Sequence, residues 1–377
     1  MSDRSVRFIL VGGFLGAGKT TTLARLARHF IGQGRTVGIV TNDQAGNLVD
    51  TQLLREQGFP VNEVTGACFC CQFDELARQL EDLEQRVHPD VFLAEPVGSC
   101  VDLAATVLQP LLHRYGRRLR IAPYAVLFKP VHGLRILGSD TPASVPPGGF
   151  SPQAAYIFRK QLEEADVILV NRADEYSRQE LQALQERISQ QYPETPVLIV
   201  SAKTGQGFAE YLELLTQEGN FGRRLLEVDY DLYAAGEAEL GWLNSTVELQ
   251  ADVPFSLDDW SVRLLQAIRE ELAQGAGEIA HAKVICLGEL GFASANLVAS
   301  ASRVELGISC RVPTRRAACI VNLRAAASPE SLEHALDVAL RHCAHGMGIQ
   351  ATLTAHRALR PGRPQPTYRY RTPVASA

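Results

Sequence analysis

The first residues whose types and spacing predict chemistry form a glycine-rich loop. Residues 13–20 match the pattern G-x-x-x-x-G-K-[ST] in full, between an apolar stretch and an amphipathic one. Glycines let successive backbone N–H groups turn inward onto a phosphate, and the start of the next helix adds its positive dipole end. We therefore expect a nucleotide phosphate site at Gly13, Gly16, Ala17, Gly18, Lys19, Thr20 and Thr21.

Two side chains of this loop have separate expected roles. Lys19 can reach the β- and γ-phosphates, and the hydroxyl of Thr20 can ligate Mg²⁺. The acidic residue that completes such a magnesium site belongs at the end of another strand, and Glu95 follows the apolar residues 91–94. The alternative for Glu95 is a carboxylate that caps a loop. We expect Mg²⁺ as a cofactor, with Lys19 and Glu95 as catalytic residues.

A later segment predicts which base the site reads. Asn171, Arg172 and Asp174 follow an apolar run and nearly match N-K-x-D, in which the aspartate accepts hydrogen bonds from guanine N1–H and the 2-amino group. Adenine offers neither donor, and a site built around a specific hydrogen bond rejects the analogue strongly. Arg172 replaces the usual lysine, and its guanidinium plane can stack on a base. ATP remains the alternative nucleotide. The residues expected beside the base edge are Ser201, Ala202 and Lys203.

Three cysteines, Cys68, Cys70 and Cys71, lie within four residues of one another. Thiolates this close can converge on one soft or borderline cation, and Zn²⁺ held by three of them keeps a fourth position open. Buried structural thiols are one alternative, and a redox pair at Cys70 and Cys71 is another. We expect a transition-metal site, with Zn²⁺ or Co²⁺ as the ion.

Taken together, these motifs carry a family resemblance. The run GGFLGAGKTT, the C-x-C-C triplet, Glu95 at a strand end and the run QLEEADVILVNRAD occur in the order of the CobW/HypB/UreG family of P-loop GTPases. The chain resembles the CobW-type branch most, over residues 6–207. The resemblance implies a metallochaperone that couples GTP hydrolysis to delivery of a metal or metal cofactor, with Cys68, Cys70 and Cys71 as metal ligands. Nucleotide-dependent homodimers would suit it.

The chain also departs from this family. The first switch often reads N-E-x-G-E there, whereas residues 42–46 read Asn-Asp-Gln-Ala-Gly here, so that Gly46 replaces a carboxylate. Asp43 and Asp50 remain as candidates for the magnesium shell or for positioning water, and Asp43 is a further candidate catalytic residue. Lys129 stands where an aspartate is expected after a strand. No histidine-rich stretch is present.

The elements that must position these residues form two patterns. Apolar runs at 6–11, 36–41, 91–94, 124–128, 166–170 and 196–200 alternate with amphipathic helical stretches such as 19–30 and 73–86. Continuous apolar strands alternating with helices indicate a mostly parallel sheet covered on both faces, the α/β architecture of P-loop NTPases. We assign residues 1–225 to this GTPase domain.

The second pattern predicts a smaller α+β domain with a mainly antiparallel sheet. Strands are expected at 242–249, 279–287, 295–306 and 318–323, and helices at 257–272 and 329–343. The expected boundaries are a polar linker at 226–239, a CobW C-terminal-like domain at 240–360 and a basic, proline-containing tail at 361–377. This tail is expected to be solvated, or else to touch an acidic or phosphate-bearing partner.

Composition limits the partners. Of the 377 residues 46% are hydrophobic and 21% charged, which is ordinary for a globular protein, and the net charge of −5 predicts no nucleic-acid partner. No apolar run reaches 18 residues and no signal peptide is evident, so we expect a cytoplasmic protein and no membrane contact. In that compartment the eight cysteines should be thiols or metal ligands rather than disulfides.

The sequence therefore predicts a GTPase that delivers a transition metal or metal cofactor to a metal-requiring client protein. One alternative is a nucleotide-gated module that senses metal or redox state, with incidental hydrolysis. Another is a small-molecule kinase that uses the same phosphate loop.

Overall fold

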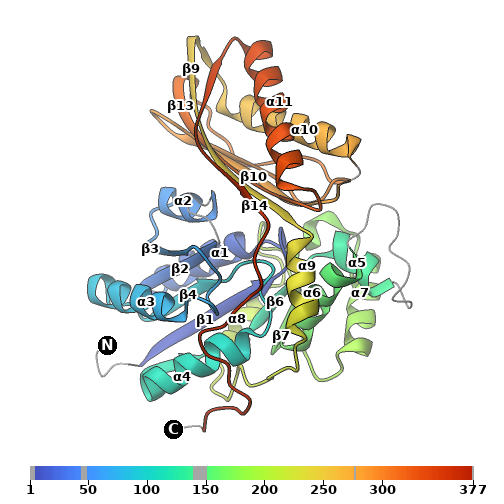
Figure 1. Ribbon diagram of the computed structural model, residues 1–377. Coiled ribbons are helices and arrows are strands. Elements are labelled where there is room, and N and C mark those ends of the chain that lie inside the picture. Colours follow the sequence, from blue (N-terminus) through green and yellow to red (C-terminus); the bar gives the residue numbers. More distant parts are fainter. Residues whose placement is uncertain (1–4, 44–48, 139–150, 276, 376–377) are drawn as a thin grey trace.

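A computed structural model describes residues 5–43, 49–138, 151–275 and 277–375. Two sheets lie one above the other, with the chain passing from the lower to the upper between α9 and β9 (Figure 1). The lower sheet has the strand order β3-β2-β4-β1-β6-β7-β8, and β5 pairs with β1. Its pairings are parallel. Its strands are β1 (Val6–Gly13), β2 (Val37–Asp43), β3 (Val61–Thr65), β4 (Val91–Glu95), β5 (Leu119–Ile121), β6 (Ala125–Phe128), β7 (Val167–Val170) and β8 (Val197–Ile199).

Helices cover both faces of this sheet because its strands are apolar on both sides. On β1, Phe8 and Leu10 enter one core, and Ile9 and Val11 enter the other. Helices α3 and α6 contribute to the first core, and α1 and α8 to the second. The helices of this part are α1 (Lys19–Gly32), α2 (Val49–Glu56), α3 (Phe73–Val87), α4 (Gln109–Tyr115), α5 (Pro130–Gly138), α6 (Pro152–Glu163), α7 (Arg178–Gln191), α8 (Phe208–Thr216) and α9 (Tyr230–Ala238). The predicted α/β architecture is confirmed.

The upper sheet is antiparallel, with the order β12-β11-β10-β13-β9-β14. Its strands are β9 (Gly241–Phe255), β10 (Ile279–Gly288), β11 (Phe292–Leu297), β12 (Glu305–Ile308), β13 (Thr314–Ala325) and β14 (Gln350–Leu359). Helices α10 (Leu257–Gln274) and α11 (Pro329–Met347) share an apolar core with one face. The other face meets the lower sheet at the end of β2, where Asn244 and Arg324 contact Asp43.

Several expectations differ from the observed elements. Residues 295–306, predicted as one strand, contain parts of both β11 and β12, and residues 226–239, predicted as a linker, contain helix α9. Strand β14 was not predicted. Cys286 and Cys319, expected as thiols, lie directly opposite each other on β10 and β13 and are joined by a disulfide. Cross-strand register, which a linear pattern does not reveal, brings these two cysteines together.

The chain after β14 is largely exposed, as expected, but it is held against the lower part of the molecule. It returns along the lower sheet, which the dark red trace in Figure 1 follows down to the C-terminus. Arg369 pairs with buried Asp102 at 2.5 Å, and the ring of Tyr368 lies 5.3 Å from that of Phe73. Two of the arginines that suggested an acidic partner, Arg363 and Arg369, therefore pair with Asp231 and Asp102 of the same chain. No helix among the described residues has the length and apolar character needed to cross a bilayer.

Candidate functional site

The glycine-rich loop joins β1 to α1 in a conformation that only glycine adopts easily. Gly13, Gly16 and Gly18 have φ angles of 125°, 72° and 99°. A Cβ on Gly18 would stand 2.4 Å from the side-chain amide of Asn171, and one on Gly13 would stand 2.6 Å from a backbone oxygen of β6. The glycines at these two positions therefore also permit close packing beneath the loop.

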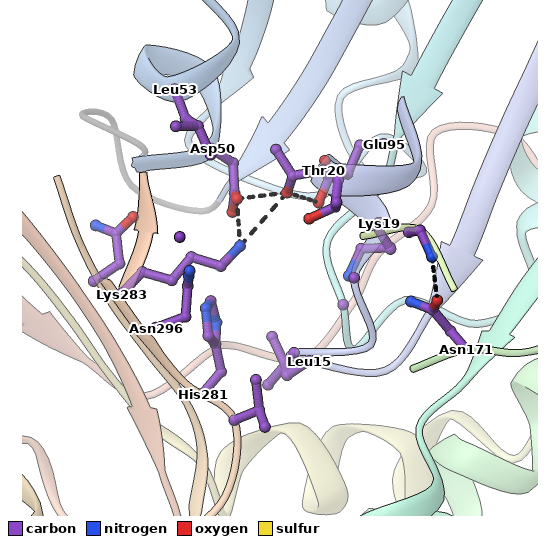
Figure 2. Close-up of a pocket in the computed structure, with 18 of the residues that line it drawn as sticks. Leu15, Lys19, Thr20, Asp50, Leu53, Glu95, Asn171, His281, Lys283 and Asn296 are labelled. Carbon is purple, nitrogen blue, oxygen red and sulfur yellow. Dashed lines mark hydrogen bonds and ion pairs between the residues drawn. The ribbon is translucent and has the colours of Figure 1, made fainter. Parts of the chain in front are cut away.

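Asp50 and Glu95 converge on Thr20 at the start of α1. Thr20 Oγ1 lies 2.5 Å from Asp50 Oδ1 and 3.2 Å from Glu95 Oε1 (Figure 2). Lys19 donates to the Gly13 carbonyl at 3.1 Å. Burial, followed by the charge of Asp50, raises the pKa of Glu95 to about 7. Within the described residues, the second oxygen of Glu95 is buried with no hydrogen-bond partner. Oxygens from three side chains converge here, and the unpartnered Glu95 Oε2 adds a further acceptor, a set that fits a hard divalent cation such as Mg²⁺.

The segment predicted to read the base is hydrogen-bonded to the phosphate loop through Asn171. Asn171 donates to the Ala17 carbonyl at 2.7 Å and accepts from the Ala202 N–H at 2.9 Å. Ser201 donates to Asp174 at 2.6 Å, which orients that carboxylate. One pocket is lined by most of the predicted nucleotide residues, namely Gly16, Gly18, Lys19, Thr20, Thr21, Asn171, Arg172, Asp174, Ala202 and Lys203.

Two predicted residues have partners that the sequence did not suggest. Arg172 forms ion pairs with Glu175 at 2.5 Å and with Glu305 of β12 at 3.0 Å, so here its guanidinium is engaged by carboxylates. Asp43 pairs with Arg324 of β13 at 2.8 Å and accepts from Asn244 at 3.2 Å. Asp43 and Asp50 both line the nucleotide pocket, whereas Gly46 lies outside the described residues.

The cysteine triplet follows β3 and is separate from the nucleotide pocket. The Cys68 sulfur lies 2.7 Å from that of Cys70 and 3.3 Å from that of Cys71, and the Cys70 and Cys71 sulfurs are 3.7 Å apart. Cys68 and Cys70 are buried and Cys71 is half-buried. Sulfurs bound at 2.3 Å around a tetrahedral Zn²⁺ lie about 3.8 Å apart. The three thiols would therefore need to move apart only slightly to bind one Zn²⁺ ion.

Comparison with known proteins identifies the group to which these sites belong. The sequence model described as the CobW/HypB/UreG nucleotide-binding domain matches residues 7–199, which is about half of the chain. The chain belongs to this family. Members of this family are GTPases, and two curated relatives of the chain are zinc chaperones by name.

Two relatives carry such names. The zinc chaperone YeiR of Escherichia coli (strain K12) is 29% identical over 184 residues, covering 47% of this chain and 49% of YeiR. The zinc chaperone CobW of Sinorhizobium sp is 25% identical over 230 residues, covering 54% of this chain and 60% of that protein. The chain thus spans about half the length of the curated relatives it matches.

Solved structures of the family are more distant. HypB from Helicobacter pylori in complex with nickel is 19% identical, with a TM-score of 0.39 over 58% of this chain and 92% of HypB. Zn(II)-bound YjiA GTPase from E. coli is 16% identical, with a TM-score of 0.35 over 89% of this chain and 98% of YjiA.

In this CobW/HypB/UreG family member a fourth cysteine, Cys100, lies near the triplet, whose own three sulfurs lie within 4.8 Å of one another. Hydrogen bonds from the thiols of Cys100, Cys70 and Cys71 hold the pKa of Cys68 well below its usual value, and Cys100 is the strongest contributor. Cys100 is buried and stands five residues after Glu95. A lone cysteine that far from the triplet carries no sequence signal of its own, so sequence reasoning missed it.

The upper sheet supplies residues that sequence reasoning also missed. His281, Lys283, Asn322 and Arg324 line the nucleotide pocket together with the phosphate loop. Lys283 forms an ion pair with Asp50. Burial opposes ionisation of Asp50, but the charge of Lys283 and its hydrogen bond hold the pKa of Asp50 below its usual value. These residues lie more than 200 positions after the loop, and only the fold brings them to it.

Lys129, which departs from the family pattern, links the phosphate loop to the upper sheet by hydrogen bonds. Its buried ammonium donates to the carbonyls of Leu15, Ala280 and Val298 at 2.7, 3.0 and 2.9 Å. Leu15 belongs to the phosphate loop, and the other two belong to the upper sheet or its edge. Lys129 therefore fixes the position of the upper sheet over the nucleotide pocket.

Proposed function

We propose that this protein binds and hydrolyses GTP and couples that cycle to holding and releasing a thiophilic divalent metal, with Zn²⁺ as the leading candidate, for a client protein. Gly13 to Thr21 bind the phosphates, while Asp174 reads guanine. Thr20, Asp50 and Glu95 hold Mg²⁺, which when bound neutralises charge on the transferring phosphoryl group. The cargo metal binds at Cys68, Cys70 and Cys71, with Cys100 supplying the fourth sulfur.

The observation that carries the proposal is the position of Asn42. This residue lines the nucleotide pocket beside Asp43 at the end of β2. Its side chain also holds the cysteine loop, which is the segment of residues 66–72 between β3 and α3. The Asn42 amide donates to the carbonyls of Val64 and Ala67 at 3.0 and 2.8 Å and accepts from the Phe69 N–H at 2.7 Å. One side chain therefore contacts both sites, and its movement at one alters the other.

A second connection runs along the segment after β4. Glu95 and Gly98 line the nucleotide pocket, and Cys100, two residues further on, lies near Cys68 and Cys70. A Cβ on Gly98 would stand 3.0 Å from the backbone nitrogen of Leu15, so this segment packs tightly against the phosphate loop. A shift of the segment on γ-phosphate loss would move Cys100 relative to its neighbours, which suits release of a metal.

The deciding experiment is a pair of calorimetric titrations. GTP and ATP are titrated with Mg²⁺ into the full chain, with and without one equivalent of Zn²⁺ or Co²⁺, and the control is the Cys68→Ala, Cys70→Ala, Cys71→Ala variant. We expect GTP to be preferred and metal affinity to change with nucleotide only when the cysteines are present. Independent binding, or nucleotide binding without metal binding, would point instead to structural or redox cysteines and to the regulatory module.

The rate of hydrolysis gives a further check. A carrier that releases its metal only to a client should hydrolyse GTP slowly when it is alone, because each round of hydrolysis would otherwise release the metal without a client. Many turnovers per second by the purified protein alone would contradict a regulated carrier, and a phosphorylated acceptor in place of free phosphate would indicate a kinase.

A further inference from the structure

The upper sheet presents a polar face to the nucleotide pocket. Side chains alternate along a strand, so His281 and Lys283 of β10 share one face, while Ala282 and Val284 enter the core with α10 and α11. Register places Arg324 opposite His281 and Asn322 opposite Lys283 on β13. These four residues line the pocket, which a sheet face built only to pack against a neighbouring domain would not require.

Lys283 reaches the end of the phosphate loop at Thr20. Its ammonium pairs with Asp50 and lies 3.5 Å from Thr20 Oγ1 (Figure 2). Thr20 and Asp50 are two of the three residues assigned above to magnesium. An ammonium and Mg²⁺ would repel each other strongly if both bound the same oxygens. Lys283 must therefore leave Asp50 whenever Thr20 and Asp50 bind Mg²⁺.

We propose that Lys283 contacts the γ-phosphate of bound GTP, as a second lysine supplied in cis by the upper sheet. This inference rests on the GTPase function proposed above. Lysine carries a compact charge on a flexible four-carbon stem, so its ammonium can turn by a few ångströms without moving the strand. Lys283 stands beside Thr20 and Asp50, the residues proposed above to hold Mg²⁺. That ion bridges the β- and γ-phosphates in P-loop NTPases, so a γ-phosphate would lie within reach of this ammonium.

The surroundings of Lys283 suit this role. The Nε2 atom of His281, on the same strand face, is buried and has no hydrogen-bond partner within the described residues, and it lines the same pocket. An unpartnered polar atom at this depth is costly unless a ligand completes it. The upper sheet therefore offers two side chains to a ligand where the γ-phosphate would extend.

The contact would let the upper sheet distinguish GTP from GDP. Asn322 accepts from the Val49 N–H at 2.8 Å and Arg324 pairs with Asp43, so β13 holds both described ends of the segment between β2 and α2. Without a γ-phosphate, Lys283 of β10 also holds this segment through its ion pair with Asp50. With GTP bound, Lys283 would contact the γ-phosphate instead. A second lysine there would also help to neutralise the charge spread over the transferring phosphoryl group and so speed hydrolysis.

The test compares two nucleotides in the full-length Lys283→Met variant. Affinities for GDP and for a non-hydrolysable GTP analogue are measured by calorimetry with Mg²⁺ in the wild type, in this variant and in Lys283→Gln, and Lys160→Met on α6 is the matched control. We expect both Lys283 variants to lose about tenfold or more in affinity for the analogue relative to GDP, the size of one charge-assisted contact. Affinity for GDP should be unchanged or tighter, because Lys283 no longer competes for Asp50.

Each outcome decides a separate question. An unchanged ratio of analogue to GDP affinity in both variants, with GDP still binding, would overturn the contact and leave Lys283 as an ion pair between the two sheets. Lys283→Arg should keep most of the preference for the analogue, since it retains the charge. If the wild type itself binds neither nucleotide, the proposed GTPase function fails instead.

Discussion

Arg324 of the upper sheet and Asp43 of the lower sheet form an ion pair at 2.8 Å, with 4% and 3% of their side chains exposed. The guanidinium of Arg324 also stacks on the Trp242 ring at 4.2 Å. Removing one partner of a buried pair leaves the other charge uncompensated, which costs about 3–5 kcal/mol. We therefore expect Arg324→Met to destabilise the chain by roughly that amount in urea denaturation.

The double variant Asp43→Asn, Arg324→Met should recover most of this loss, because it leaves no buried charge unpaired. Arg78→Ala is the control, since its ion pair with Glu75 is on the surface and should contribute less than about 1 kcal/mol. A single variant as stable as the wild type would show that the pair does not hold the two sheets together.

Asn42 should be needed for communication between the two sites rather than for binding at either one. Asn42→Ala removes the three hydrogen bonds that hold the cysteine loop, yet leaves the phosphate loop and the thiols intact. A wild-type coupling free energy of about 1–3 kcal/mol between GTP and metal is expected to fall below about 0.5 kcal/mol in the variant.

The control for this experiment is Asn62→Ala, on the neighbouring strand β3. Its side chain bonds to α3 residues and makes no hydrogen bond to the cysteine loop. Metal affinity is titrated with GDP and with a non-hydrolysable GTP analogue in both variants. Equal coupling in the two variants would remove Asn42 from the proposed route.

Cys100 should strengthen metal binding although it lies outside the C-x-C-C triplet. Cys100→Ser is expected to weaken Zn²⁺ binding at least tenfold, measured by competition with a chromophoric chelator. Cys343→Ser on α11 removes another buried thiol far along the chain and should leave the affinity unchanged. Equal affinities in the two variants would mean that the triplet binds metal without Cys100.

Acid should loosen the upper sheet through His281. Burial, followed by the charges of Lys283 and Arg324, lowers the pKa of His281 well below 6.5. The folded chain therefore keeps this imidazole neutral while the unfolded chain takes up a proton, so the stability it contributes is present above about pH 6.5 and is lost as pH falls below it.

The expected loss from His281 is about 1.4 kcal/mol in the free energy of unfolding for each pH unit below about 6.5. His281→Asn should make the fall between pH 7.5 and 5.5 shallower, and His334→Asn, at an exposed position on α11, should not. Identical pH profiles for wild type and His281→Asn would contradict a neutral, buried imidazole.

Local sequence determined the parts of the site that are contiguous. The glycines at 13, 16 and 18 must accept positive φ angles, and Lys19 and Thr20 follow them at the start of α1, where both line the same pocket. Asn171 follows a buried strand, which puts it at the same sheet edge as the loop. Each of these inferences needed only a strand, a turn and a helix that are adjacent in the chain.

The tertiary structure alone decided what surrounds that site. Lys283, Arg324 and Glu305 reach the nucleotide pocket because an antiparallel sheet packs on the ends of parallel strands. Cys100 comes near the triplet because the segment after β4 and the segment after β3 leave the same edge of the parallel sheet. Ion pairs and hydrogen bonds act over a few ångströms in space, whereas a sequence pattern reports neighbours a few residues apart. Contacts between residues about 130 to 280 positions apart, such as Arg172 with Glu305 and Asp43 with Arg324, therefore become visible only once the chain has folded.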